Sequence, residues 1–166
     1  MFLKDKEILE YVNNKKLIAM EFDEKHLTPS GYDLRVDLGS SIKSKSGGEE
    51  FYISSVKCLT TEYLKIPDDI IGLLFLKSKY CRKGVWGNFG LVDAGFEGKL
   101  EFTLFRINVE VFEESIENDI PVVQIIFYKL DDKVGKNYAK RSGNFQFYGL
   151  ELGDIQKIKY PSFIVE

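Results

Sequence analysis

Apolar and polar positions follow a helical pattern only at the start of the chain. Over residues 3–17 the apolar side chains fall roughly on one helix face, with acidic residues early and Lys15 and Lys16 late. This order of charges suits the helix dipole, which favours negative charge in the first turn and positive charge in the last. The pattern predicts one short N-terminal helix.

The remainder of the chain shows short apolar runs separated by turn residues, a pattern typical of β-strands. Residues 32–38 alternate between apolar and charged side chains, which predicts a half-buried strand. The polar, glycine-containing residues 40–50 predict a surface loop or hairpin tip. Further strands are predicted at 51–56, 58–64, 70–76, 99–108, 109–112 and 122–130. So many short strands indicate an all-β fold, a barrel or jelly roll, in one domain spanning 1–166.

The composition is that of an ordinary globular domain, and it argues against several classes of protein. Of the 166 residues, 44% are hydrophobic and 30% are charged, which is enough for one substantial core. The net charge of -3 gives no electrostatic reason to expect nucleic-acid or membrane partners. No apolar run suits a membrane span or signal peptide, and Cys58 and Cys81 make no disulfide framework. We therefore expect a cytoplasmic protein.

The common catalytic templates do not fit this sequence. A single histidine, His26, excludes a two-histidine metal centre. The chain has no Gly-x-x-x-x-Gly-Lys-Ser/Thr phosphate loop, which excludes a P-loop enzyme. It also has no Cys-x-x-Cys pair, which disfavours a zinc-dependent deaminase.

Four polar residues interrupt or end apolar runs, namely Asp33, Ser78, Asp93 and Gln124. A buried polar side chain needs a hydrogen-bond partner or a functional role. Because Lys and Arg residues lie nearby, the set suits a site that grips phosphates and orients a water molecule. Taken singly, each residue could equally satisfy a turn, a loop or a neighbouring strand.

The order and spacing of these residues resemble the dUTPase/dCTP deaminase superfamily over roughly residues 3–146. Residues 3–8 look like the opening helix of the dCTP deaminase branch. Six further segments resemble family motifs in the family's order: Thr28-Pro29-Ser30-Gly31-Tyr32-Asp33-Leu34, residues 59–70, Lys77-Ser78-Lys79-Tyr80-Cys81-Arg82, Val92-Asp93-Ala94-Gly95-Phe96-Glu97-Gly98, Val123-Gln124-Ile125-Ile126-Phe127 and Arg141-Ser142-Gly143-Asn144-Phe145-Gln146.

The resemblance implies a distorted β-barrel or jelly roll of the dUTPase-like type, assembled as a homotrimer with shared active sites. It implies that Asp93 holds a water that attacks the α-phosphate of dUTP, while Mg²⁺ bridges the phosphates near Asp33 and residues 133–166 close over the site. The phosphate-binding residues that it implies are Lys77, Ser78, Arg82, Gln124 and Arg141. The nucleoside-binding residues that it implies are Leu91, Val92, Phe96, Thr103, Phe145 and Gln146.

Departures from the family pattern select among its activities. In the dCTP deaminase branch, a Glu on the strand after the Asp hairpin serves as acid and base, and Thr103 stands at that place here. Glu101 lies two residues earlier, which is about 6–7 Å along a strand and beyond hydrogen-bond reach for the same proton transfer. Lys77 stands where the family usually has Arg, so the bidentate grip on phosphate is lost.

Because Asp93 is retained, we expect a dUTP diphosphatase that forms dUMP and pyrophosphate. One alternative is a dCTP deaminase, or a bifunctional enzyme that makes dUMP from dCTP. The other is a non-catalytic regulatory protein that binds deoxynucleoside triphosphates.

Overall fold

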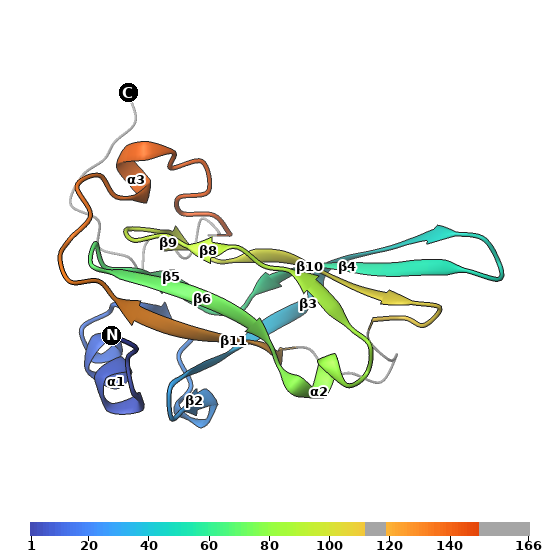
Figure 1. Cartoon of the computed structure of the whole chain (residues 1–166), viewed down its shortest axis with the longest axis horizontal. Helices are drawn as coiled ribbons and strands as arrows, with labels where there is room; N and C mark the ends of the chain where they lie inside the picture. Colours follow the sequence, from blue (N-terminus) through green and yellow to red (C-terminus); the bar gives the residue numbers. More distant parts are fainter. Residues whose placement is uncertain (112–118, 150–166) are drawn as a thin grey trace.

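Strands dominate the computed structural model, which describes residues 1–111 and 119–149 (Figure 1). In chain order the elements are α1 (Asp5–Asn13), β1 (Leu17–Met20), η1 (Glu24–His26), β2 (Leu27–Thr28), β3 (Gly31–Gly47), β4 (Tyr52–Thr60), β5 (Tyr63–Lys65), β6 (Ile70–Leu76), α2 (Ser78–Cys81), β7 (Trp86–Asn88), β8 (Leu91–Val92), β9 (Glu97–Gly98), β10 (Glu101–Ile107), β11 (Ile120–Lys129) and α3 (Tyr138–Arg141). The predicted all-β fold with a short N-terminal helix is confirmed.

Two sheets carry the architecture. An eight-stranded sheet runs β7-β10-β4-β3-β11-β6-β8, with β2 paired to β3, and a three-stranded sheet runs β1-β5-β9. One cluster of buried apolar side chains lies around Ile8, Leu64 and Phe127, and a second lies around Val36 and Leu104. None of the helices in the described residues is long and apolar enough to cross a membrane.

The N-terminal helix is shorter than the predicted span of 3–17. It begins after Lys4, whose backbone N–H donates to the carboxylate of Glu7 at 2.8 Å, and it ends at Asn13. Lys15 and Leu17 then adopt positive φ angles of 56° and 61°, which turn the chain into β1. Leu17 was assigned to the helix because it is apolar, but its fully buried side chain belongs to β1.

The sequence predicts a surface loop or hairpin tip at residues 40–50, and the structure shows a hairpin whose tip occupies only the end of that stretch. β3 continues to Gly47 and pairs with β4, so that only the tip of a long hairpin arm is a turn. All side chains from 43 to 50 are exposed, and Figure 1 shows the arm projecting from the body of the molecule. The polar composition reflects a strand with both faces in solvent, which local periodicity cannot distinguish from a loop.

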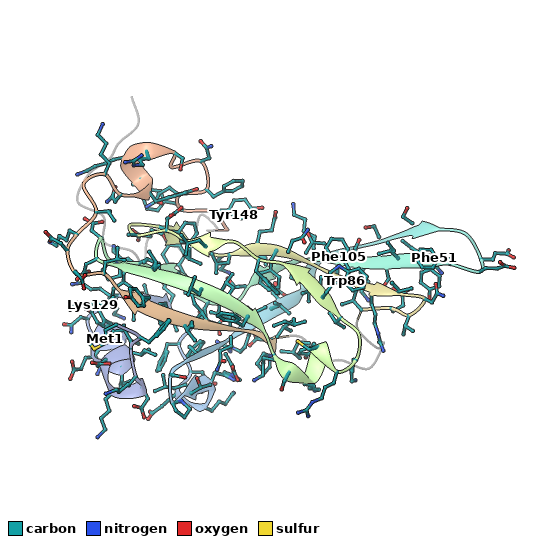
Figure 2. All side chains as sticks on the ribbon, viewed as in Figure 1. Met1, Phe51, Trp86, Phe105, Lys129 and Tyr148 are labelled. Carbon is teal, nitrogen blue, oxygen red and sulfur yellow. The ribbon has the colours of Figure 1, made fainter. Side chains whose placement is uncertain are left out.

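Large aromatic side chains remain exposed on the arm and beside it (Figure 2). Phe51, at the tip of the arm, is 55% exposed, and Trp86 on β7 is 40% exposed. Trp86 stacks on Phe105 of β10, with ring centroids 5.8 Å apart. This apolar face is therefore open to solvent in the single chain.

Two other predicted strands differ from the structure, and two helices were not predicted. The run 58–64 divides between β4 and β5, which belong to different sheets. The run 109–112 forms no strand over residues 109–111, because Asn108 turns the chain with a φ of 54°, and residue 112 lies outside the described residues. The four-residue helices α2 and α3 are too short for a helical pattern to register in sequence.

A buried ionic network braces β3. Arg35 was predicted on the polar side of this strand, yet it is only 8% exposed. Its Nε donates to the fully buried carboxylate of Glu62 at 2.7 Å, and its backbone N–H donates to the same carboxylate at 2.9 Å. A second guanidinium nitrogen pairs with Asp119 at 2.7 Å. Burial opposes the guanidinium charge, but the hydrogen bond to Glu62 and the charges of Glu62 and Asp119 together outweigh burial and raise the pKa of Arg35.

Candidate functional site

The hairpin that carries Asp93 joins the two sheets. β8 pairs with β6 through Val92 and Gly72, and β9 pairs with β5 through Gly98 and Leu64. A side chain at Gly72 would stand 3.1 Å from the Cβ of Val92, so the missing Cβ lets β8 approach β6. The turn between the strands holds Asp93 at the surface while its neighbour Val92 is buried.

A cavity of about 220 Å³ opens beside Asp93. Its lining brings together the predicted site residues Leu91, Val92, Asp93, Phe96 and Phe145. It also includes residues that sequence reasoning did not assign to the site, namely Lys99, Leu100, Glu101, Tyr138 and Tyr148. Thr103 and Gln146 are absent from the described lining of this cavity. A further cavity of about 270 Å³ has both Asp93 and Arg141 in its wall.

The C-terminal segment, residues 137–149, lies against the Asp93 hairpin of the same chain. Tyr138 donates its backbone N–H to the Ala94 carbonyl at 2.9 Å, and its ring meets that of Phe96 at 5.5 Å. The Gln146 amide accepts from the backbone N–H of Glu97 and donates to the carbonyl of Gly95, both at 3.2 Å. Gln146 therefore holds the hairpin backbone, while Phe145, 55% exposed, stands at the cavity.

A three-residue ionic cluster lies on the wall of the same cavity. The Glu101 carboxylate accepts from the Tyr148 hydroxyl at 2.6 Å and from the Lys57 ammonium at 2.8 Å. Partial burial would raise the pKa of Glu101, but the hydrogen bonds from Lys57 and Tyr148 outweigh it and lower this pKa. The bond to Glu101 raises the pKa of Tyr148. Glu101 is therefore held in its ionised form.

Thr103 lies two residues after Glu101 on β10, on the same face of the strand. In the sheet it stands opposite Lys57 of β4 and Asn88 of β7, so these side chains share a face with Glu101. Its hydroxyl cannot exchange a proton as a carboxylate does near neutral pH. At this place the chain therefore offers no carboxylate for deamination.

Four of the five predicted phosphate-binding residues lie toward the other end of β6, whereas Arg141 lies with Asp93. Lys77 and Ser78 follow β6 at the start of α2, and Asp33 of β3 stands opposite Gln124 of β11. The Lys77 ammonium forms an ion pair with the Asp33 carboxylate. The Gln124 amide donates to the Thr28 hydroxyl at 3.0 Å. Arg82 lies exposed at the end of α2.

The two groups of predicted residues are far apart within one chain. Because Val92 pairs with Gly72, Asp93 lies level with Ile71, and Lys77 follows six residues later. At ~3.3 Å per residue this separation is roughly 20 Å. Figure 1 shows α2 at one end of β6 and the β8–β9 hairpin at the other. Within a single chain, Asp93 and Lys77 are therefore too far apart to contact the same phosphate group.

The described residues do not build a site for a resident metal ion. Over 1–111 and 119–149, no group of three or more His, Cys, Asp or Glu side chains is arranged to hold one. Asp33, predicted near the metal, has its carboxylate engaged by Lys77.

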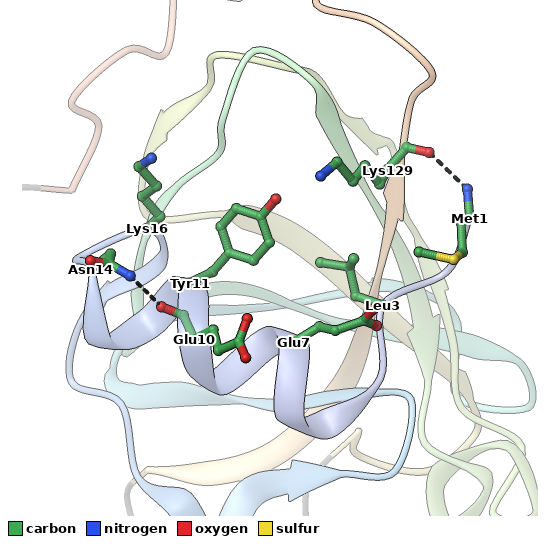
Figure 3. Close-up of a pocket in the computed structure, with 8 residues that line it drawn as sticks. All are labelled: Met1, Leu3, Glu7, Glu10, Tyr11, Asn14, Lys16 and Lys129. Carbon is green, nitrogen blue, oxygen red and sulfur yellow. Dashed lines mark hydrogen bonds between the residues drawn. The ribbon is translucent and has the colours of Figure 1, made fainter.

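A cavity of about 290 Å³ beside α1 contains no predicted site residue. Glu7 and Glu10 lie on its helical wall, and Tyr11, Lys16 and Lys129 surround its opening (Figure 3). Glu7 is already used to cap α1. Neither Asp93 nor any predicted phosphate-binding residue lines this cavity, and we assign it no role in the reaction.

Comparisons with known proteins find relatives over most of the chain. A family model described as dCTP deaminase-like matches residues 49–130. A dCTP deaminase of Pyrococcus horikoshii is 33% identical over 139 residues, covering 80% of this chain and 86% of the relative. A protein of Sulfolobus islandicus rod-shaped virus 1 named "probable deoxyuridine 5'-triphosphate nucleotidohydrolase" is 34% identical over 155 residues, covering 88% and 93%.

A solved structure supports the fold. The crystal structure of 2'-deoxycytidine 5'-triphosphate deaminase from Agrobacterium tumefaciens superimposes with a TM-score of 0.57 at 15% identity. The match covers 76% of this chain and 47% of that chain, so this chain spans about half of that structure. Together, the fold and the motif order define a dUTPase-like β-fold protein. The chain belongs to the dCTP deaminase/dUTPase-like superfamily.

Proposed function

We propose that this protein is a dUTP diphosphatase that converts Mg²⁺-bound dUTP into dUMP and pyrophosphate. The observation that carries the proposal is the combination of Asp93 on an exposed hairpin with Thr103 at the place of the deaminase Glu. Glu101 does not substitute for that Glu, because its carboxylate is ionised and occupied by Lys57 and Tyr148. Its lowered pKa makes it a poor acid for proton transfer near neutral pH.

In the proposed reaction Asp93 accepts a proton from a water molecule as the water oxygen bonds to the α-phosphorus. The bond between the α-phosphorus and the bridging oxygen to the β-phosphate breaks, and pyrophosphate leaves with that oxygen. Lys77, Ser78, Gln124, Arg82 and Arg141 supply positive charge and donors for the phosphate oxygens. The metal ion belongs to the substrate and neutralises charge on the phosphates.

The cavity beside Asp93 supports the nucleoside part of the proposal. Phe96, buried beneath the cavity, would pack under the deoxyribose, and Phe145 at its mouth would cover the base. Backbone groups of the hairpin would read the uracil edge. Leu91, 52% exposed, offers the base an apolar contact in the cavity wall.

We further propose that the active site forms between subunits of a homotrimer. The roughly 20 Å between Asp93 and Lys77 within one chain exceeds hydrogen-bond reach many times over, which supports a site in which a second chain supplies one of the two groups. The exposed aromatic face around Trp86 and Phe105 is the kind of surface that subunit contacts cover.

The names of the relatives favour deamination of dCTP as the second candidate, alone or combined with dUTP hydrolysis. The relative from Pyrococcus horikoshii is named a dCTP deaminase. Under this alternative the protein would release ammonia from dCTP without a carboxylate at Thr103.

A product assay distinguishes the candidates. Purified protein is incubated separately with dUTP and dCTP in the presence of Mg²⁺, and nucleotides, pyrophosphate and ammonia are quantified. We expect dUMP and pyrophosphate from dUTP, no ammonia from dCTP, and at least a ~100-fold loss of turnover in Asp93→Asn. Ammonia from dCTP would overturn the choice between activities, and full turnover in Asp93→Asn would overturn the assignment of Asp93. Binding of dUTP without turnover would favour the regulatory alternative.

A further inference from the structure

The C-terminal segment is attached to the cavity wall most firmly at Tyr148. Its carbonyl accepts from the backbone N–H of Lys99 at 2.9 Å, and the preceding Phe147 donates its N–H to the Glu97 carbonyl at 2.6 Å. Gly98 permits this approach, because a Cβ there would stand 3.1 Å from the backbone nitrogen of Tyr148. The segment therefore extends the Asp93 hairpin as a short parallel bridge between Gly98 and Tyr148.

The side chain of Tyr148 links this backbone contact to two strands of the large sheet. Its hydroxyl bonds Glu101 of β10, and Glu101 in turn bonds Lys57 of β4. The other edge of the Tyr148 ring meets Phe145, with centroids 5.6 Å apart and planes at 81°. Glu101 thus fixes Tyr148, and Tyr148 fixes the orientation of Phe145 at the mouth of the cavity.

We propose that Glu101 is a positioning residue that, through Tyr148 and with Lys57 as its counter-ion, latches residues 145–149 over the nucleoside cavity. This inference rests on the proposed function for the identity of the substrate, but the attachment of residues 145–149 by Glu101 and Tyr148 does not depend on it. The latch acts on binding, because it holds Phe145 where the base would enter and touches no group that transfers a proton. Its loss weakens nucleotide binding and leaves the chemical step unchanged.

Tyr148→Phe and Glu101→Gln test the latch, since both keep the shape of the side chain. Steady-state kinetics with Mg²⁺-bound dUTP are measured beside limited trypsin digestion of the ligand-free protein, with the cut after Arg141 followed by mass spectrometry. Tyr52→Phe is the matched control, because no hydrogen bond of its hydroxyl is observed within the described residues and its ring lies under Lys45 on the distant arm.

We expect KM to rise about five- to tenfold in Tyr148→Phe, as for the loss of one charge-assisted hydrogen bond, with kcat changed less than about twofold. Cleavage after Arg141 should accelerate, and for KM and cleavage the double variant should behave like Tyr148→Phe alone, because both changes remove the same hydrogen bond between Tyr148 and Glu101. Tyr52→Phe should match the wild type.

An unchanged KM and cleavage rate in Tyr148→Phe would overturn the latch, and so would additive effects in the double variant. A fall in kcat with KM unchanged would give Glu101 a role in the chemistry instead. If the wild type does not hydrolyse dUTP, the proposed function fails, and the trypsin comparison alone still decides whether Glu101 and Tyr148 hold the segment.

Discussion

Replacing Glu62 by Gln tests the brace behind the phosphate-binding strands. The change keeps the volume of the side chain but removes the negative charge that faces Arg35 at 2.7 Å. The Glu62 carboxylate accepts hydrogen bonds from the backbone and guanidinium of Arg35 and from the Tyr32 hydroxyl, the last at 3.3 Å. In the Gln variant an amide N–H, which is itself a donor, would face these donors. Burial raises the pKa of Tyr32, so this hydroxyl remains a donor at any ordinary pH.

The expected loss of stability in Glu62→Gln follows from the burial of the ion pair between Arg35 and Glu62. Breaking a buried ion pair by neutralising one partner destabilises a protein by about 3–5 kcal/mol. Arg35 keeps its second partner, Asp119, whose side chain is 41% exposed, so we expect the lower end of that range, about 3 kcal/mol. With a urea m-value of about 2 kcal/mol/M, the midpoint of unfolding should fall by about 1.5 M.

Urea unfolding followed by circular dichroism measures this change, with all variants at one protein concentration because subunit association would add to stability. Lys25→Gln is the control: its ion pair with Asp23 is as short, at 2.6 Å, but the lysine side chain is 69% exposed. We expect less than about 1 kcal/mol there. A loss below about 1 kcal/mol in Glu62→Gln, or an equal loss in the control, would refute the reasoning from burial.

Three further predictions concern the site. Lys77→Ala should raise KM for dUTP about 10- to 100-fold by removing a charged donor, whereas Lys77→Arg should not; steady-state kinetics decide this. The pKa of Glu101 is lower in the folded protein than its ordinary value near 4.5. Ionised Glu101 therefore contributes fully to the free energy of unfolding above pH 4.5, and this contribution is lost as the pH falls through the pKa of the folded state. The urea midpoints of wild type and Glu101→Gln should therefore differ at pH 6 and converge toward pH 3, and a constant difference would contradict this. Gly95→Ala should destabilise the protein by about 1–3 kcal/mol in urea, because Gly95 has a φ of 82° and a Cβ there would stand 2.6 Å from Asn137; unchanged stability would refute it.

Local pattern was enough to predict the fold class, whereas the Asp93 hairpin was predicted from the resemblance of residues 92–98 to a family motif. The alternation around Tyr32 and Leu34 specifies a strand, and both side chains are fully buried as expected. The segment from Val92 to Gly98 combines a turn glycine with flanking apolar residues, a signature contained in seven consecutive positions. Such features are legible in sequence because their causes lie within a few residues of one another.

Contacts between distant segments could not be predicted in this way. From the sequence alone, Arg35 is expected to be an exposed strand residue. Its partner Asp119 lies 84 positions later, so the pair becomes apparent only in the fold. Glu101 and Tyr148 are 47 positions apart, and nothing in their own neighbourhoods indicates that they meet. A polar residue within an apolar stretch indicates that it has a hydrogen-bond partner, but it does not indicate which residue that partner is.

The placement of Asp93 and Lys77 at opposite ends of β6 makes complementation between defective chains possible. A chain with Asp93→Asn retains the phosphate-binding group, and a chain with Lys77→Ala retains the hairpin. If sites form between neighbours, mixing the two variants under conditions that exchange subunits assembles intact sites from defective chains. With equal amounts and random exchange, about one quarter of the sites would receive both intact groups. Each defective protein would then restore activity to the other.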